Sequence, residues 1–118
     1  MINVIIYHNP KCSKSRETLA LIQNAGISPN VIEYLNTPPD STTIEQWLKD
    51  SRMEARDLLR SNEEIYQELN LSDLSLSDED LIAAMVSHPV LINRPIVVTR
   101  HGTRLCRPAE RVLEILKP

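Results

Sequence analysis

The sequence has few aromatic residues and no phenylalanine: its 118 residues include one tryptophan and three tyrosines. The core must therefore be built mainly from aliphatic side chains. A chain of this length is long enough to bury one sizeable core. We therefore expect a single domain over residues 1–118.

The N-terminus lacks a basic region, and its apolar stretch is too short for a signal sequence or a membrane span. Charges of both signs are interspersed, and the net charge is −3. This balance gives no general reason to expect a nucleic acid or an anionic membrane as a partner. We expect a cytoplasmic monomer without a nucleic-acid or membrane partner.

Cysteine is also scarce, with Cys12 and Cys106 only. Nothing indicates secretion, so a structural disulfide is not expected. Position 15 is serine and position 18 is threonine, which excludes the Cys-x-x-Cys motif and the Cys-x5-Arg loop of thiol phosphatases. The scattered histidines provide no zinc site, and we expect neither a metal nor a bound cofactor. Any disulfide step would have to recruit a thiol from elsewhere.

The N-terminal third predicts a parallel strand–helix–strand unit. Residues 2–7 are nearly all apolar, as in a strand covered on both faces. Apolar spacing predicts a helix from Ser13 to Ala25, which Gly26 ends. Residues 31–34 predict the second strand. A unit of this length is expected to have a right-handed crossover.

The middle of the chain predicts a helical insert over about 40–87. Three Ser/Thr-x-x-Glu/Asp patterns there match helix-start capping motifs, beginning at Thr42, Ser61 and Ser77. The stretches that follow carry Leu, Ile, Met and Trp at helical spacing. We therefore expect three or four short helices.

The C-terminal part predicts a hairpin and a closing helix. Residues 95–99 and 103–106 read as antiparallel strands joined at Gly102, and Pro108 suits the first turn of a helix. The order βαβ, helical insert, ββα predicts an α/β protein with a mixed sheet and a thioredoxin-like fold. Its core would comprise residues 1–37 and 88–118.

Cys12 is the best candidate for a reactive group. It lies between the first strand and the first helix, where an exposed thiol would meet unpaired backbone N–H groups and the positive end of the helix dipole. Both favour thiolate over thiol. The same N–H groups form an anion site. The position therefore indicates a thiol enzyme that acts on a small oxyanion, whereas Cys106 reads as a core thiol.

Three arginines lie where they would suit an oxyanion. Arg94 and Arg107 each precede a proline at a strand boundary, which fixes an extended backbone at the arginine. The proline before the third strand of a thioredoxin-like fold lies beside the cysteine and is commonly cis. Arg60 is expected to close a short helix. Guanidinium forks engage two oxygens at once. Taken singly, each also fits a surface or capping role.

Two polar residues near Cys12 have alternative interpretations. His8 would assist proton movement or favour the thiolate, or else be a packed turn residue. Ser15 would donate a hydrogen bond to the sulfur or to the anion, or else pack in the first helical turn.

The chain strongly resembles the glutaredoxin-coupled arsenate reductases. The matching segments are Ile6-Tyr7-His8-Asn9-Pro10-x-Cys12, Ser15-Arg16-x-Thr18-Leu19, Leu58-Leu59-Arg60, His88-Pro89, Leu91 to Thr99 and Gly102 to Pro108. The resemblance covers essentially the whole chain.

This resemblance implies that Cys12 forms a thiolate–arsenate adduct, that His8 helps to keep it ionised, and that Arg60, Arg94 and Arg107 contact arsenate and arsenite. It also implies glutathione as the reductant, glutaredoxin as the protein that resolves the adduct, and detoxification of arsenic as the role. The missing second local thiol agrees with an external reductant.

Two alternatives stay open at the level of sequence. One is a redox-sensing regulator of the same fold that binds RNA polymerase, although such proteins usually carry the Cys-x-x-Cys that Ser15 excludes. The other is a related reductase whose substrate is a different oxyanion or a glutathione mixed disulfide.

Overall fold

The computed structural model describes residues 3–116, which form two compact units. One unit comprises the residues up to Thr37 together with those from Arg94 onward, and the other comprises Pro38–Asn93. The thioredoxin-like core therefore resumes at Arg94, later than the predicted position 88. The helical part correspondingly extends beyond position 87.

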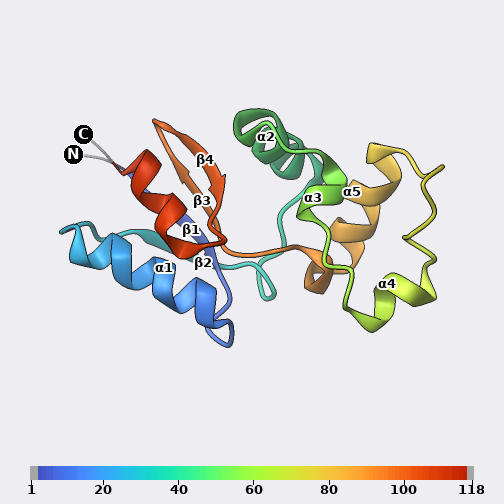
Figure 1. Cartoon of the computed structure of the whole chain (residues 1–118), viewed down its shortest axis with the longest axis horizontal. Helices are drawn as coiled ribbons and strands as arrows, with labels where there is room; N and C mark the ends of the chain where they lie inside the picture. The colour runs from blue at the N-terminus through green and yellow to red at the C-terminus, as the bar shows by residue number, and fades with distance from the viewer. Residues whose placement is uncertain (1–2, 117–118) are drawn as a thin grey trace. The chain divides into compact units, whose positions relative to one another are not determined.

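The first unit contains a four-stranded mixed sheet in the order β2-β1-β3-β4 (Figure 1). β1 pairs in parallel with β2 and antiparallel with β3, and β3 pairs antiparallel with β4. The strands are β1 (Ile5–His8), β2 (Asn30–Glu33), β3 (Ile96–Thr99) and β4 (Gly102–Leu105). The predicted parallel unit, hairpin and thioredoxin-like topology are confirmed.

Two helical segments pack against each other beside this sheet: α1 (Ser13–Asn24) and the 3₁₀ helix η2 (Ala109–Ile115) (Figure 1). Gly26 has φ +81°, which suits glycine and ends α1 as predicted. The closing helix is present, but it is a 3₁₀ helix, and Pro108 precedes it as the N-cap residue.

The main buried cluster of this unit is aliphatic, apart from the Cys106 thiol. This cluster draws on β1, α1, β3 and η2, and consists of Val4, Ile6, Ile22, Val97, Cys106, Val112, Ile115 and Leu116. β1 alternates between partly exposed and buried side chains. Neither face of the strand is exposed, as expected for a strand covered on both faces, although Ile6 and His8 are buried more deeply than Ile5 and Tyr7.

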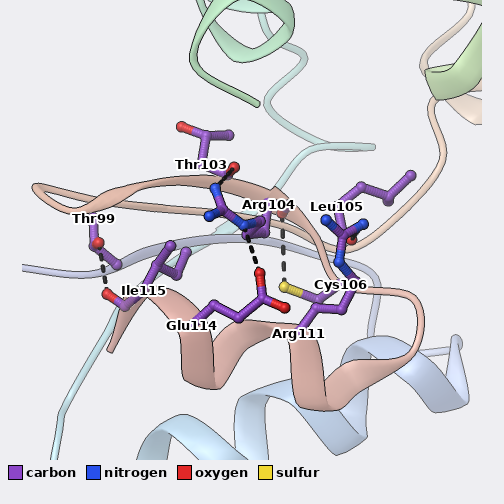
Figure 2. A network of polar contacts seen from close by, with 8 residues as sticks. All are labelled: Thr99, Thr103, Arg104, Leu105, Cys106, Arg111, Glu114 and Ile115. Atoms are coloured by element: carbon purple, nitrogen blue, oxygen red, sulfur yellow. Dashed lines mark hydrogen bonds and ion pairs between the residues drawn. The ribbon is translucent and has the colours of Figure 1, made fainter. Parts of the chain in front are cut away.

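A small polar network joins the hairpin to η2 (Figure 2). The Nε of Arg104 donates to Oε1 of Glu114 at 2.9 Å, and the Thr99 hydroxyl donates to the Ile115 carbonyl at 2.8 Å. The Cys106 thiol donates to the Arg104 carbonyl at 3.7 Å. These contacts hold the last helix on the sheet and satisfy the buried sulfur.

The second unit contains the predicted short helices. They are α2 (Ser41–Ser51), α3 (Ala55–Leu58), α4 (Glu64–Glu68) and α5 (Asp78–Ser87), followed by the 3₁₀ helix η1 (Pro89–Leu91). None of the described helices is long and apolar enough to cross a membrane.

The helix starts follow the capping predictions only in part. At α5 the Ser77 hydroxyl accepts the Asp80 N–H at 3.1 Å, and Asp80 accepts the Ser77 N–H at 3.0 Å, as predicted. The N-cap of α2 is Asp40, which accepts the Thr43 N–H at 2.8 Å, so the predicted start at Thr42 is wrong. The predicted start at Ser61 is also wrong, because α4 begins after Glu63.

Candidate active site

Cys12 is the N-cap residue of α1, as the strand–turn–helix pattern predicted. β1 ends at His8, and a tight turn follows in which the Cys12 N–H donates to the Asn9 carbonyl at 3.0 Å. The helix then begins at Ser13, so its first N–H groups lie beside the cysteine. The sulfur therefore lies at the positive end of a twelve-residue helix.

The Cys12 side chain is buried, with 6% of its surface exposed, so the expectation of an exposed thiol is wrong. Burial by itself raises the pKa of Cys12, but four nearby groups outweigh it and bring the pKa below its ordinary value. In order of effect these are the Ser15 N–H, the Arg94 charge, the Lys14 N–H and the Arg107 side chain. The site thus stabilises a thiolate in a place largely shielded from water.

Arg94, which precedes β3, and Arg107, which follows β4, both lie near this cysteine. Nη1 of Arg107 lies 3.9 Å from the Cys12 sulfur and donates to the Arg94 carbonyl at 3.1 Å. The peptide bonds Arg94–Pro95 and Arg107–Pro108 are both cis, which confirms the prediction for Pro95. Two of the three predicted arginines therefore lie beside Cys12.

His8 contacts Ser15 directly. Its Nδ1 lies 2.6 Å from the Ser15 hydroxyl, which also accepts the Asn9 N–H at 3.0 Å. Burial lowers the pKa of His8, the Glu33 charge raises it, and the Arg16 charge lowers it, with a net shift downward. A neutral His8 can accept a hydrogen bond from the Ser15 hydroxyl at Nδ1. Ser15 thus links His8 to the helix start and meets Cys12 through its backbone N–H.

Asn9 and Arg16 also shape the turn, and the sequence analysis assigned them no role. The Asn9 side chain accepts the Lys11 N–H at 3.0 Å, and Arg16 donates to the Pro10 carbonyl at 2.9 Å. An Asn-Pro dipeptide is itself a turn signal, because the Asn side chain bonds its own backbone two residues on. That signal indicates Asn9, whereas the contact of Arg16 follows only from the folded turn.

Arg60 belongs to the second unit. α3 ends at Leu58, so Arg60 follows the helix and does not close it as predicted. Its N–H donates to the Leu91 carbonyl at 2.8 Å, and its guanidinium pairs with Glu63 at 2.6 Å. The arginine is therefore anchored to η1 by its backbone and to Glu63 by its side chain.

This arrangement can perform nucleophilic chemistry on an anion. It combines a cysteine whose pKa is lowered, helix N–H groups and two guanidiniums, and the described residues contain no cluster of His, Cys, Asp and Glu side chains that could hold a metal. These groups favour an anionic sulfur and an anionic guest at one place.

Comparison with known proteins agrees with this site. The model of the ArsC family matches residues 7–115, which include both cysteines and the hairpin. The chain belongs to the ArsC family. This membership accounts for the resemblance in the Cys12 turn and in the segment from Leu91 to Pro108.

Relatives within the ArsC family match nearly the whole chain. An arsenate reductase of Yersinia enterocolitica is 54% identical over 98% of this chain and 82% of its own length. The uncharacterized protein YfgD of Escherichia coli K12 is 54% identical over 96% of both chains. A solved arsenate reductase structure from Vibrio cholerae superimposes with a TM-score of 0.94 at 54% identity, over 98% of both chains. This chain and the Vibrio cholerae protein therefore share the same fold over nearly their whole length.

Proposed function

We propose that this protein reduces arsenate to arsenite, with Cys12 as the nucleophile. The observation that carries the proposal is a thiolate-favouring cysteine at the start of α1, with the Arg107 guanidinium 3.9 Å from its sulfur. Its ArsC family membership and relatives named arsenate reductase support the choice of oxyanion.

Binding begins at the helix start. Arsenate is a tetrahedral anion, so the N–H groups of Ser15 and Lys14 and the forks of Arg94 and Arg107 are suited to its oxygens. The Cys12 thiolate attacks arsenic, an S–As bond forms, and one oxygen leaves as water after taking up protons. The guanidiniums stabilise the negative charge during this displacement. Arsenic stays in the +5 state at this stage.

Reduction requires electrons from outside the chain. Glutathione adds its sulfur to arsenic, and a second water leaves. A glutaredoxin thiolate then attacks the glutathione sulfur, an S–S bond forms, and the electron pair of the broken S–As bond passes to arsenic, which becomes As(III). Water releases arsenite and restores the Cys12 thiol. The protein itself needs no bound cofactor in this scheme.

The burial and the raised pKa of Cys106 support the proposal that the reducing thiol comes from another molecule. Cys106 is fully buried, and burial raises its pKa to about 12. A protonated core thiol is a poor nucleophile and has no access to an adduct on Cys12. Because glutathione and glutaredoxin are cytoplasmic thiols, the proposal places the protein in the cytoplasm, where it acts as a monomer in arsenic detoxification.

His8 and Arg60 take the roles that the resemblance implies. His8 would support the ionised nucleophile through the Ser15 hydroxyl, which lies 2.6 Å from its Nδ1. Arg60 would supply a third guanidinium to the oxyanion. Its contact with Glu63 fixes its side chain within the second unit.

The deciding measurement is arsenite formation from arsenate with glutathione and glutaredoxin, compared with thioredoxin as the reductant. We expect turnover with glutaredoxin and little with thioredoxin. Cys12→Ser should lower turnover by about a thousandfold or more, because a serine hydroxyl is not ionised at neutral pH. Turnover of another oxyanion but not of arsenate would refute arsenate as the substrate. Substantial activity of Cys12→Ser would refute the covalent step.

A further inference from the structure

A pocket of about 190 Å³ lies in the first unit beside the nucleophile turn. One wall is the turn itself, residues 8–11, which leads directly into Cys12. The other wall consists of Glu33 at the end of β2 and of Leu35 and Asn36, which follow it. Of its lining residues, only His8 has a role in the proposed reaction.

Both walls are held by backbone structure. His8 and Glu33 are register partners in the parallel pair of β1 and β2, so the two walls start from adjacent strands. The Glu33 carbonyl accepts the Asn36 N–H at 2.9 Å, which closes the turn after β2. On the facing wall, the Asn9 side chain accepts the Lys11 N–H at 3.0 Å. The pocket is therefore formed before a ligand arrives.

The lining carries opposite charges. Lys11 supplies an ammonium from one wall and Glu33 a carboxylate from the other. Within residues 3–116 neither side chain forms an ion pair or a side-chain hydrogen bond, so both can engage a ligand. Leu35 is 44% exposed at the same place and offers an apolar contact.

This combination suits an α-amino-acid head group. Such a group carries a carboxylate and an ammonium on one carbon, which complement a lysine and a glutamate, and its methylene groups can cover a leucine. The pocket is smaller than the 300–1,000 Å³ typical of sites for drug-sized ligands, so it fits one end of a larger molecule.

We propose that this pocket binds the γ-glutamyl end of glutathione. Lys11 contacts its carboxylate, Glu33 its ammonium and Leu35 its methylene groups. The cysteinyl part extends out of the pocket along the turn that carries Cys12. The inference rests on the proposed function, because it takes glutathione as the co-substrate, and it adds no covalent step.

The kinetic test varies glutathione at saturating arsenate and glutaredoxin. We expect Lys11→Ala and Glu33→Gln each to raise the KM for glutathione about three- to fivefold, as partly exposed ion pairs allow, with kcat at saturating glutathione retained. The matched controls are Lys49→Ala and Glu17→Gln, which remove the same charges from exposed helix positions outside the pocket. Their KM for glutathione should equal that of the wild type.

Cysteinylglycine, which lacks the γ-glutamyl group, sharpens this test. Wild-type enzyme should use glutathione at a lower KM than cysteinylglycine, and both pocket variants should lose that preference. An unchanged KM for glutathione in both variants, or an equal rise for cysteinylglycine, would overturn the proposal.

A binding measurement separates this proposal from the arsenate reaction. S-Methylglutathione, which has no free thiol, is titrated into the wild-type protein without arsenate while backbone amide NMR shifts are followed. Shifts at Lys11, Leu35 and Asn36 that weaken in Glu33→Gln support the pocket even if arsenate is not reduced. Shifts confined to other regions, or no binding by a protein that does reduce arsenate, refute the pocket and leave the proposed reaction standing.

Discussion

The two cysteines show how strongly position alters one side chain. Both are buried, yet the pKa of Cys12 is lowered and that of Cys106 is raised to about 12. Cys12 meets helix N–H groups and two guanidiniums, whereas Cys106 belongs to a largely aliphatic cluster and its thiol donates to the Arg104 carbonyl (Figure 2). Burial alone therefore does not decide the pKa of a thiol: helix N–H groups and guanidiniums outweigh it at Cys12, whereas at Cys106 it outweighs the charges of Arg111 and Arg104.

This contrast predicts the pH dependence of alkylation. Because the Cys12 pKa is lowered, its reaction with iodoacetamide should reach half its maximal rate at a lower pH than that of a free thiol, and the rate should fall as acid protonates the sulfur. Arg107→Ala should move this midpoint to higher pH, since it removes a group that lowers the pKa. Mass spectrometry identifies the alkylated residue.

The control within the same molecule is Cys106, which should react only after unfolding. Alkylation of Cys106 in the folded protein at neutral pH, or an Arg107→Ala midpoint equal to that of the wild type, would contradict this account.

The Arg107 fork supports a second prediction. Arg107→Lys keeps the positive charge but loses the planar pair of donors, so kcat/KM for arsenate should fall about tenfold. Steady-state kinetics measures this change. Arg100→Lys, at an exposed position beyond β3, is the matched control and should match the wild type. Equal activity of Arg107→Lys and wild type would show that charge alone suffices.

Among the elements, the short helices of the second unit depend on their caps. The longest of them, α2, has 11 residues, or about three turns, so helix propensity by itself stabilises these helices little. The reciprocal bonds between Ser77 and Asp80 satisfy two backbone groups at the start of α5. This cap therefore helps to define where α5 begins.

Ser77→Ala should lower the free energy of unfolding by about 1 kcal/mol, because the Asp80 N–H loses its acceptor. Urea denaturation followed by circular dichroism measures the change. Ser72→Ala is the matched control, since Ser72 is exposed and its hydroxyl forms no hydrogen bond within the described residues. A loss of stability equal in both variants would argue against the cap.

At the scale of the whole molecule, an oxyanion that binds only the folded chain must stabilise it. In Cys12→Ser, which cannot form the covalent adduct, arsenate at ten times its Kd should add about 1.4 kcal/mol and raise Tm by about 5 °C. Differential scanning fluorimetry with arsenate measures the shift. Adding Arg107→Ala should reduce it, and an undiminished shift would place the bound anion elsewhere.

Local signals predicted most of the architecture. The apolar runs and Gly26 indicated the parallel unit, and Gly102 indicated the hairpin, because periodicity and turn chemistry act over a few residues. The cap of α2 was missed because Asp40 and Thr42 compete as N-cap residues, and only the folded chain selects between them. The same limit applies to Ser61 and Glu63.

The sequence predicted which residues form the candidate site, but it did not predict their burial or their contacts. Cys12, Arg94 and Arg107 were selected from their positions beside a helix start and two prolines. That the thiol is buried could not be inferred, since the arginine beside it is 95 positions away in the chain. The contact of His8 with Ser15 likewise depends on the path of the turn.

The amino-acid sequence by itself determined the cysteine at the helix start, the order of the elements and the aliphatic character of the core, because each depends on neighbours along the chain. Only the tertiary structure decided the opposite pKa shifts of the two thiols, the approach of Arg107 to Cys12 and the charged pocket between Lys11 and Glu33. Burial and Coulomb energies depend on distances in space, which segments remote in sequence set when they fold together.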